Sequence, residues 1–224
     1  MIKSDHIDYK AIHPNNFLNA DCMDYLRQMP DKYVDLAIVD PPYGIDVTKL
    51  KIRANKKGKH WDASPPASEY FEQLFRISKN QIIWGMNFLN DYLPKCEKTV
   101  IWDKQNDGTY GSDYELAWTS FEGAKQEIFR LMWYGYFYPK EELPLLHPTQ
   151  KPIALYRWLI KKFGRAGDLI LDTHVGSVSS LIACIELGFD YIGFEIDKDY
   201  WTEATKRLGK ARRVYELFEK QNKD

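Results

Sequence analysis

The chain has 224 residues, of which 44% are hydrophobic, and this is enough to bury a full core within one domain. Its formal net charge of −1 argues against indiscriminate binding of polyanions. No run of about 18 uncharged apolar residues occurs, and the first residues lack a signal-peptide stretch, so we expect a cytoplasmic protein without a membrane partner. The three cysteines and five histidines show no disulfide or metal-ligand spacing, so no metal is expected.

Short apolar strand patterns alternate with helical patterns along the chain. Strands are expected at residues 34–39, 81–85, 99–102, 115–118, 128–133, 169–171 and 191–194. Helices are expected at residues 66–78, 152–163, 178–187 and about 199–219. This alternation predicts an α/β fold with a doubly wound, mainly parallel sheet of the Rossmann-like type. Such a sheet binds its ligands beyond the carboxyl ends of the strands.

The string Asp40-Pro41-Pro42-Tyr43 follows the first of these strands and precedes Gly44. An exocyclic amino group of a nucleobase is a poor nucleophile because its lone pair is delocalised into the ring, so an enzyme that alkylates it must supply acceptors for its hydrogens. The Asp40 carboxylate can accept one N–H and the Pro41 carbonyl the other, while the prolines remove competing backbone donors. Tyr43 offers a face on which a base can stack. A strand ending in Asp-Pro and a proline-glycine loop are also ordinary turn signals, so the rest of the chain has to decide.

Residues 45–65 form the one long irregular stretch of the sequence, and we expect a mobile loop there. The loop carries a basic run without acidic residues, made of Lys49, Lys51, Arg53, Lys56, Lys57 and Lys59. Basic runs are often only solvated surface. Beside the Asp40 string, however, this run could hold DNA phosphates around a base that has swung out of the duplex.

A second ligand site is indicated by a strand, a tight turn and a helix start over residues 168–180. Asp172 ends the strand, and Gly176 and Ser177 stand near the helix start, where free N–H groups and a glycine let a ligand approach the backbone. Glu195 ends the next strand, 19 residues after Gly176, where an acid can accept ribose hydroxyls. The full Gly-x-Gly-x-x-Gly fingerprint is missing, so the pattern favours a nucleoside-bearing cofactor other than a nicotinamide dinucleotide.

The chain resembles the beta-class DNA amino-methyltransferases, which use S-adenosylmethionine. The resemblance rests on Asp40 to Gly44, then His147-Pro-Thr-Gln-Lys151-Pro152, then residues 171–177, and it covers nearly the whole chain. This order implies a circularly permuted arrangement of motifs. The resemblance implies adenine N6 of a flipped base in double-stranded DNA as the target, because cytosine-N4 members more often carry Ser in place of Asp40. The cofactor-binding residues that it implies are Asp21, Lys151, Pro152, Asp172, His174, Gly176, Ser177 and Glu195.

The family resemblance also implies how the domain is organised. We expect a single methyltransferase domain over residues 1–224, with DNA recognition confined to a small region within residues 45–146. The segments left for DNA contact are mainly residues 45–65 and 105–113. Family members are often dimers, which makes a homodimer an expectation here.

The chain departs from the family at the cofactor turn. Where members commonly have Asp-Pro-Phe-x-Gly-Ser-Gly-Thr, this chain reads Asp172-Thr-His-Val-Gly-Ser-Val-Ser. His174 can supply a flat surface in place of Phe, whereas Val178 adds bulk where close backbone approach is usual, which predicts altered cofactor contacts. Three alternatives stay open: a cytosine-N4 methyltransferase, a catalytically silent DNA-binding or scaffold subunit, and an enzyme acting on RNA or a protein amide.

Overall fold

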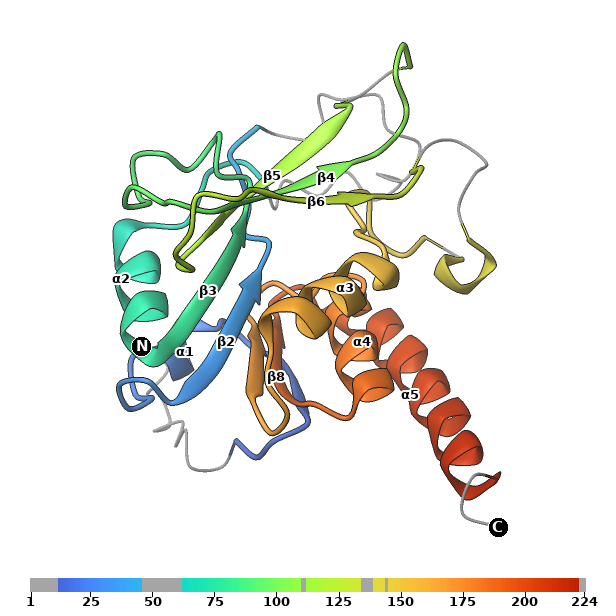
Figure 1. Ribbon diagram of the computed structural model, residues 1–224. Coiled ribbons are helices and arrows are strands. Elements are labelled where there is room, and N and C mark those ends of the chain that lie inside the picture. Colours follow the sequence, from blue (N-terminus) through green and yellow to red (C-terminus); the bar gives the residue numbers. More distant parts are fainter. Residues whose placement is uncertain (1–11, 46–61, 110–111, 134–138, 144, 222–224) are drawn as a thin grey trace.

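The computed structural model describes residues 12–45, 62–109, 112–133, 139–143 and 145–221. Within these residues, eight strands form one sheet with helices on both of its faces (Figure 1). The strands are β1 (Asn16–Asn19), β2 (Val34–Val39), β3 (Ser78–Trp84), β4 (Thr99–Asp103), β5 (Tyr114–Thr119), β6 (Glu127–Arg130), β7 (Leu169–Asp172) and β8 (Asp190–Glu195). The helices are α1 (Met23–Leu26), α2 (Ser68–Ile77), α3 (Ile153–Phe163), α4 (Ser179–Leu187) and α5 (Lys198–Gln221), with a 3-10 turn η3 (Lys140–Glu142).

The strand order across the sheet is β1-β8-β7-β2-β3-β5-β4-β6. The five strands from β1 to β3 are mutually parallel, β5 is antiparallel to both β3 and β4, and β6 is parallel to β4. The predicted mainly parallel α/β sheet is therefore confirmed. Because β2, β7 and β8 are parallel neighbours, their carboxyl ends meet at one edge of the sheet. Asp40, Asp172 and Glu195 are thereby brought to that edge.

The two faces of the sheet carry separate halves of the core. Leu36 and Ile38 of β2 pack on the side of α3, α4 and α5, whereas Ala37 and Val39 pack on the side of α1 and α2. Successive side chains of a strand point to opposite faces, so a strand covered by helices on both sides needs an unbroken apolar run. This explains why residues 34–39 form a nearly continuous apolar run and not an alternation of apolar and polar residues.

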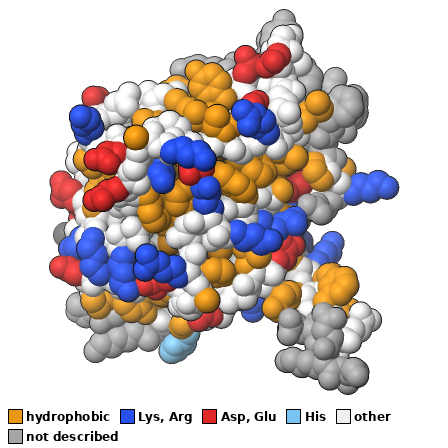
Figure 2. Space-filling view, in the orientation of Figure 1, with side chains coloured by type: hydrophobic (Ala, Val, Ile, Leu, Met, Phe, Trp, Pro, Cys, Tyr) orange, Lys and Arg blue, Asp and Glu red, His pale blue; other side chains and the backbone are white. Residues whose placement is uncertain are grey.

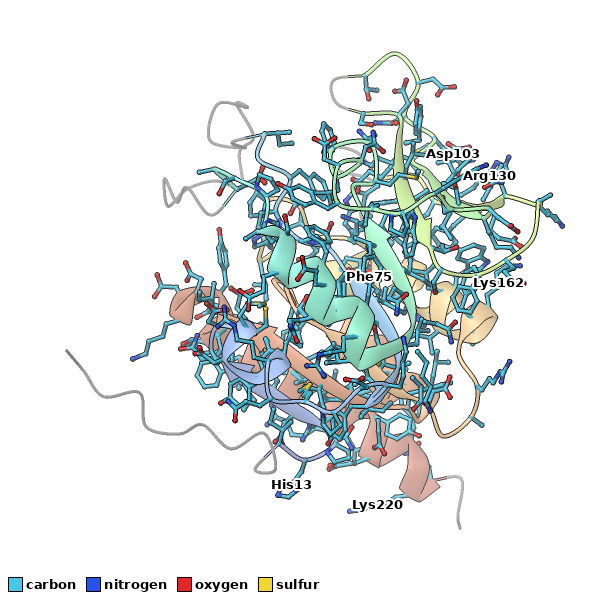
Figure 3. All side chains as sticks on the ribbon, turned by 90° about the vertical axis from the view of Figure 1, so that its left-hand side faces the viewer. His13, Phe75, Asp103, Arg130, Lys162 and Lys220 are labelled. Atoms are coloured by element: carbon cyan, nitrogen blue, oxygen red, sulfur yellow. The ribbon has the colours of Figure 1, made fainter. Side chains whose placement is uncertain are left out.

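Some strands differ from the expected ones in their presence or boundaries. Strand β1 was not predicted, and β3 begins at Ser78, three residues before the expected start. The edge strand β6 ends at Arg130 instead of residue 133. It is held to β4 by parallel pairing and by an ion pair between Arg130 and Asp103, whose charged atoms lie 3.2 Å apart (Figure 3).

The surface mixes charges of both signs. Figure 2 shows acidic and basic side chains interspersed with hydrophobic ones on the face drawn in Figure 1. None of the helices in the described part of the chain combines the length and the apolar character that crossing a membrane requires. The described residues also contain no cluster of three His, Cys, Asp or Glu side chains suited to a metal ion. The three cysteines are free thiols.

Candidate active site

A cavity of about 760 Å³ opens at the carboxyl edge of the sheet, where β2, β3 and β8 end. A volume of this size suits a ligand as large as a nucleoside derivative. The residues predicted for catalysis and for the cofactor meet here. Those that line the cavity are Asp21, Asp40, Pro41, Pro42, Tyr43, Lys151, His174, Gly176, Ser177 and Glu195.

Asp40 follows β2 directly and is held by two donors. Its Oδ2 atom lies 2.6 Å from Nζ of Lys151, and the hydroxyl of Tyr43 donates a hydrogen bond to Oδ1. Burial raises the pKa of Asp40 above its ordinary value, while the ammonium of Lys151 opposes that rise. A carboxylate offers about four lone-pair sites, so Asp40 retains capacity for a further donor from a ligand.

Lys151 stands between two carboxylates. Its Nζ atom lies 3.0 Å from Oε2 of Glu115, and Oε1 of Glu115 lies 2.7 Å from Nζ of Lys104. Burial by itself would raise the pKa of Glu115, but the ammonium groups of Lys151 and Lys104 outweigh it and lower the pKa to about 2. Burial would likewise lower the pKa of Lys151, yet Asp40 and Glu115 raise it. Four alternating charges thus run from β4 and β5 to the Asp40 string, and the side chain of Lys151 within them is only 2% exposed.

This arrangement differs from the sequence interpretation in one respect. Lys151 was assigned to the cofactor, and although it lines the cavity, its ammonium is paired with the Asp40 carboxylate. Glu115 was not singled out, because an acid within a strand pattern carries no local signal of an ion pair formed 36 positions away along the chain.

The cofactor turn is closed by Glu195. The backbone N–H of Gly176 donates to Oε2 of Glu195 at 2.9 Å, and the N–H of Asp197 donates to Oε1 at 2.8 Å. Gly176 adopts a left-handed conformation with φ of 53°, which a glycine accepts without strain. Glu195 therefore joins the ends of β7 and β8 and presents its carboxylate at the cavity wall.

Asp172 and Pro152 lie behind the cavity wall and do not line it. Asp172 is the last residue of β7 and is 1% exposed. It accepts the backbone N–H of His174 at 3.0 Å and the hydroxyl of Ser180, and burial raises its pKa to about 7. Pro152 caps the start of α3. Both residues therefore support the site through the turn and the helix that they hold.

His174 lies at the cavity in the place where the family commonly has Phe. Its ring meets Tyr70 edge-on, with centroids 5.3 Å apart, and its Nδ1 atom is 2.9 Å from Oγ1 of Thr173. Burial lowers the pKa of His174 to about 4, so the ring is neutral at pH 7. Its ring lines the cavity as a flat surface, and it is uncharged at pH 7.

The side chain of Val178 does not line the cavity and so adds no bulk there. The altered cofactor contacts stay a prediction. The residue is fully buried in the core on the α3 side and does not line the cavity. Valine in place of the family's glycine affects the backbone conformation instead. Val178 has φ of 68°, a left-handed conformation that β-branched residues rarely adopt.

The segments expected to contact DNA are only partly described. Lys49, Lys51, Arg53, Lys56, Lys57 and Lys59 lie outside the described residues. The segment 105–113 connects β4 and β5, and its residues Asn106 and Ser112 line the cavity. Asp21 is exposed at another part of the wall, where its Oδ1 accepts the N–H of Met23 at 2.9 Å.

Comparison with known proteins assigns the chain to a family. The model of the N6/N4 methyltransferase family, described as DNA methylase, matches residues 79–206. The chain is 25% identical over 240 residues to the type II methyltransferase M2.DpnII of Streptococcus pneumoniae, covering 85% of this chain and 88% of the relative.

Two solved structures share the fold. The M1.HpyAVI–SAM complex superimposes with a TM-score of 0.58 at 21% identity, covering 86% of this chain and 98% of that one. The cytosine-N4-specific PvuII DNA methyltransferase superimposes with a TM-score of 0.57 at 11% identity, covering 90% and 91%.

The chain belongs to the N6/N4 family of DNA methylases. Because the family consists of DNA methylases, DNA is the substrate that it implies. Its members are amino-methyltransferases that depend on S-adenosylmethionine. The match extends over β7, the turn at residues 172–177 and the end of β8.

Proposed function

We propose that the chain is a site-specific methyltransferase that transfers the methyl group of S-adenosylmethionine to N6 of an adenine flipped out of double-stranded DNA. One observation carries the proposal. The Asp40 carboxylate and the Gly176 turn with Glu195 line the same cavity, so an amine acceptor and a nucleoside-binding turn face one ligand space.

The residues present fit the cofactor. Glu195 offers a carboxylate for the ribose hydroxyls, Gly176 and Ser177 offer the turn for the methionine part, and His174 offers a flat neutral surface. Asp21 lines the cavity where the family resemblance implies contact with the adenine of the cofactor. When bound, the cofactor supplies an electrophilic methyl group on a sulfonium.

The Asp40 string acts on the target amine. Asp40 and the carbonyl of Pro41 would accept hydrogen bonds from its two N–H groups, which localises the lone pair on nitrogen and directs it at the methyl group in line. As the N–C bond forms, the bond between methyl and sulfur would break with its electron pair staying on sulfur, and the methylated nitrogen would then lose one proton to solvent. Pro42 carries no backbone donor that would compete. Tyr43 stacks on the base, and Lys151 holds the Asp40 carboxylate in its acceptor form.

DNA binding is assigned from the sequence. We assign phosphate contacts to the basic run Lys49, Lys51, Arg53, Lys56, Lys57 and Lys59 and recognition to the region within residues 45–146. The short recognition region fits a short target sequence or a homodimer. Adenine is favoured over cytosine because Asp40 stands where cytosine-N4 members of the family more often carry Ser.

The test is expression in a host whose DNA lacks N6-methyladenine and N4-methylcytosine, followed by sequencing of its DNA for modified bases. We expect N6-methyladenine within one short sequence, and Asp40→Ala should abolish it. Modification that persists in Asp40→Ala would refute the catalytic assignment. N4-methylcytosine would instead establish the cytosine alternative.

A silent subunit would give a different result. It would leave the host DNA unmodified, and binding of labelled S-adenosylmethionine by the purified chain would then separate an inactive subunit from an enzyme whose target sequence is absent.

A further inference from the structure

Tyr43 is held by Phe88, Asp62 and Gly85, none of which the sequence analysis connects with the Asp40 string, although Asp62 lies in the stretch 45–65 expected to contact DNA. Its ring stacks on Phe88, with centroids 5.3 Å apart and an interplanar angle of 15°. Its backbone N–H donates to Oδ1 of Asp62 at 2.6 Å. Its ring also lies directly against the backbone of Gly85. These contacts are additional to the hydrogen bond between its hydroxyl and Asp40.

Gly85 leaves no room for a side chain. A Cβ atom placed there would lie 2.1 Å from Cε1 of Tyr43 and 2.6 Å from Cζ. The residue follows β3 with φ of 79°, in the left-handed region, and its N–H donates to the carbonyl of Leu116 at 2.9 Å. Because this hydrogen bond ties Gly85 to β5, the glycine cannot retreat easily, and a side chain would have to displace Tyr43.

Phe88 completes the same turn. Its N–H donates to the carbonyl of Gly85 at 2.9 Å, and the next residue, Leu89, is fully buried and anchors the turn. The ring of Phe88 is nevertheless 48% exposed and lines the cavity. A half-exposed aromatic residue contributes little to the core, and its ring is placed to support the ring of Tyr43.

Asp62 fixes the backbone of the catalytic string. Its Oδ1 accepts both the N–H of Tyr43 and the N–H of Gly44, the latter at 3.0 Å. The residue is only 2% exposed and lines the cavity. Burying a carboxylate costs free energy of desolvation. The two hydrogen bonds that Asp62 accepts offset part of this cost and fix the backbone conformation of the turn at Tyr43 and Gly44.

We propose that Asp62, Gly85 and Phe88 form a seat that positions Tyr43, and through it the base that accepts the methyl group. The inference rests on the proposed function and extends it. Tyr43 is the surface on which the base stacks, so the seat determines where the target nitrogen stands relative to Asp40. All three are positioning residues, because they act through Tyr43 and not on the reacting atoms.

The central test compares Gly85→Ala with Gly188→Ala. Gly188 follows α4 with φ of 70°, and no atom of the described residues lies within 4 Å of the position that a Cβ would take there. Both variants therefore carry the strain of an alanine at positive φ, but only Gly85→Ala pushes on Tyr43. With a duplex carrying the mapped target sequence, Gly85→Ala should lower kcat about 100-fold, as expected for a misplacement near 1 Å. Its Kd for S-adenosylmethionine should stay within about threefold of the wild-type value.

Gly188→Ala should leave kcat within about threefold of the wild-type value. Equal values of kcat for the two alanine variants would overturn the proposal. So would a Gly85→Ala defect confined to the affinity for S-adenosylmethionine, because the proposal assigns the seat to the target base and not to the cofactor.

Two further pairs separate positioning from general stability. Asp62→Asn keeps an oxygen that accepts both N–H groups and should retain most of the wild-type kcat. Asp62→Ala removes this oxygen and should have a much lower kcat. Phe88→Ala should lower kcat, whereas Phe218→Ala, which removes a ring that is 60% exposed on α5, should not. An Asp62→Asn variant as impaired as Asp62→Ala would contradict the backbone role of Asp62.

A double-mutant cycle that uses the melting temperature Tm tests the contact between Gly85 and Tyr43 independently of activity. In the wild type, Gly85→Ala should lower Tm more than Gly188→Ala does. In the Tyr43→Ala background, the two should lower Tm equally, because the ring that Gly85→Ala would strike is gone. If the excess loss persists without Tyr43, the seat is refuted. If the wild-type chain transfers no methyl group but the cycle shows coupling, the contact holds and the proposed function fails.

Discussion

Replacing Lys151 by Met should show how much of the free energy of unfolding depends on its buried ammonium. Its side chain is 2% exposed, and its Nζ atom lies 2.6 Å from Asp40 and 3.0 Å from Glu115. Met fills a similar volume without charge, so Lys151→Met removes the cation but creates no large cavity. Glu115 keeps Lys104 at 2.7 Å, whereas the partner that the described residues leave to Asp40 is the neutral hydroxyl of Tyr43. Removing one partner of a buried ion pair typically costs about 3–5 kcal/mol.

The size of this loss should depend on pH. Without Lys151, the folded-state pKa of Asp40 rises further above the unfolded value of about 3.9. A carboxyl whose pKa is raised in the folded state binds its proton more tightly there, so the free energy of unfolding falls as pH rises above about 4. The loss should therefore be larger at pH 8 than at pH 5. For a chain of this size, about 3–5 kcal/mol corresponds to a fall in Tm of about 10 °C.

Thermal and urea unfolding at pH 5 and pH 8 would measure the effect, with Asp40→Asn in the Lys151→Met background as the rescue variant. Asparagine retains an oxygen for the Tyr43 hydroxyl and carries no charge, so the double variant should recover much of the stability lost at pH 8. A loss that is the same at both pH values, or that the double variant fails to reduce, would refute the assignment of Lys151 as the counter-ion of Asp40.

Two other changes test the cofactor turn. Asp172 has its pKa raised to about 7 by burial, so wild-type stability should decline between about pH 4 and pH 7. Asp172→Asn should flatten this decline and raise Tm at pH 8, and an unchanged pH profile of Tm would contradict the burial of a titrating carboxyl there. Val178→Gly removes a fully buried side chain but also a left-handed valine, so two effects of about 1–2 kcal/mol should nearly cancel. Val100→Gly, at an equally buried position in β4, should cost clearly more in urea unfolding, and equal losses would show that Val178 is not strained.

The fold was predictable where burial on both faces leaves a continuous apolar run. Strands β2, β7 and β8 are of this kind, and the helices that follow them have one-sided or uniformly apolar patterns. Strand β1 has the sequence Asn-Phe-Leu-Asn and is half-exposed, so neither periodicity nor composition marks it. It becomes a strand because β8 offers a free parallel edge, where Leu18 pairs with Phe194. Such a pairing depends on a partner far along the chain, which local pattern cannot supply.

The site was predictable as far as its motifs are contiguous. The strings at Asp40 and Gly176 are short, and sheet topology alone brings them to one edge. Glu115, Asp62 and Phe88 join the site only through tertiary contacts. For Gly85 the sequence contains a weak signal, because a glycine at a strand often marks a place where another group approaches the backbone closely. The identity of that group, the ring of Tyr43, follows only from the structure.

A carboxylate buried against an internal cation argues against the acceptor role that the sequence predicts for Asp40, unless the paired carboxylate can still accept an amino hydrogen. A buried carboxylate without a partner would take up a proton, and an unprotonated one beside a sulfonium would itself be a nucleophile for the methyl group. Lys151 and the Tyr43 hydroxyl reduce both tendencies, because they hold the negative charge with two strong donors. The carboxylate then remains ionised enough to accept an amino hydrogen and too weakly nucleophilic to compete with the amine. On this reasoning, Lys151→Met should lower the rate of DNA methylation as well as stability, and a variant that is less stable but equally active would separate the two roles.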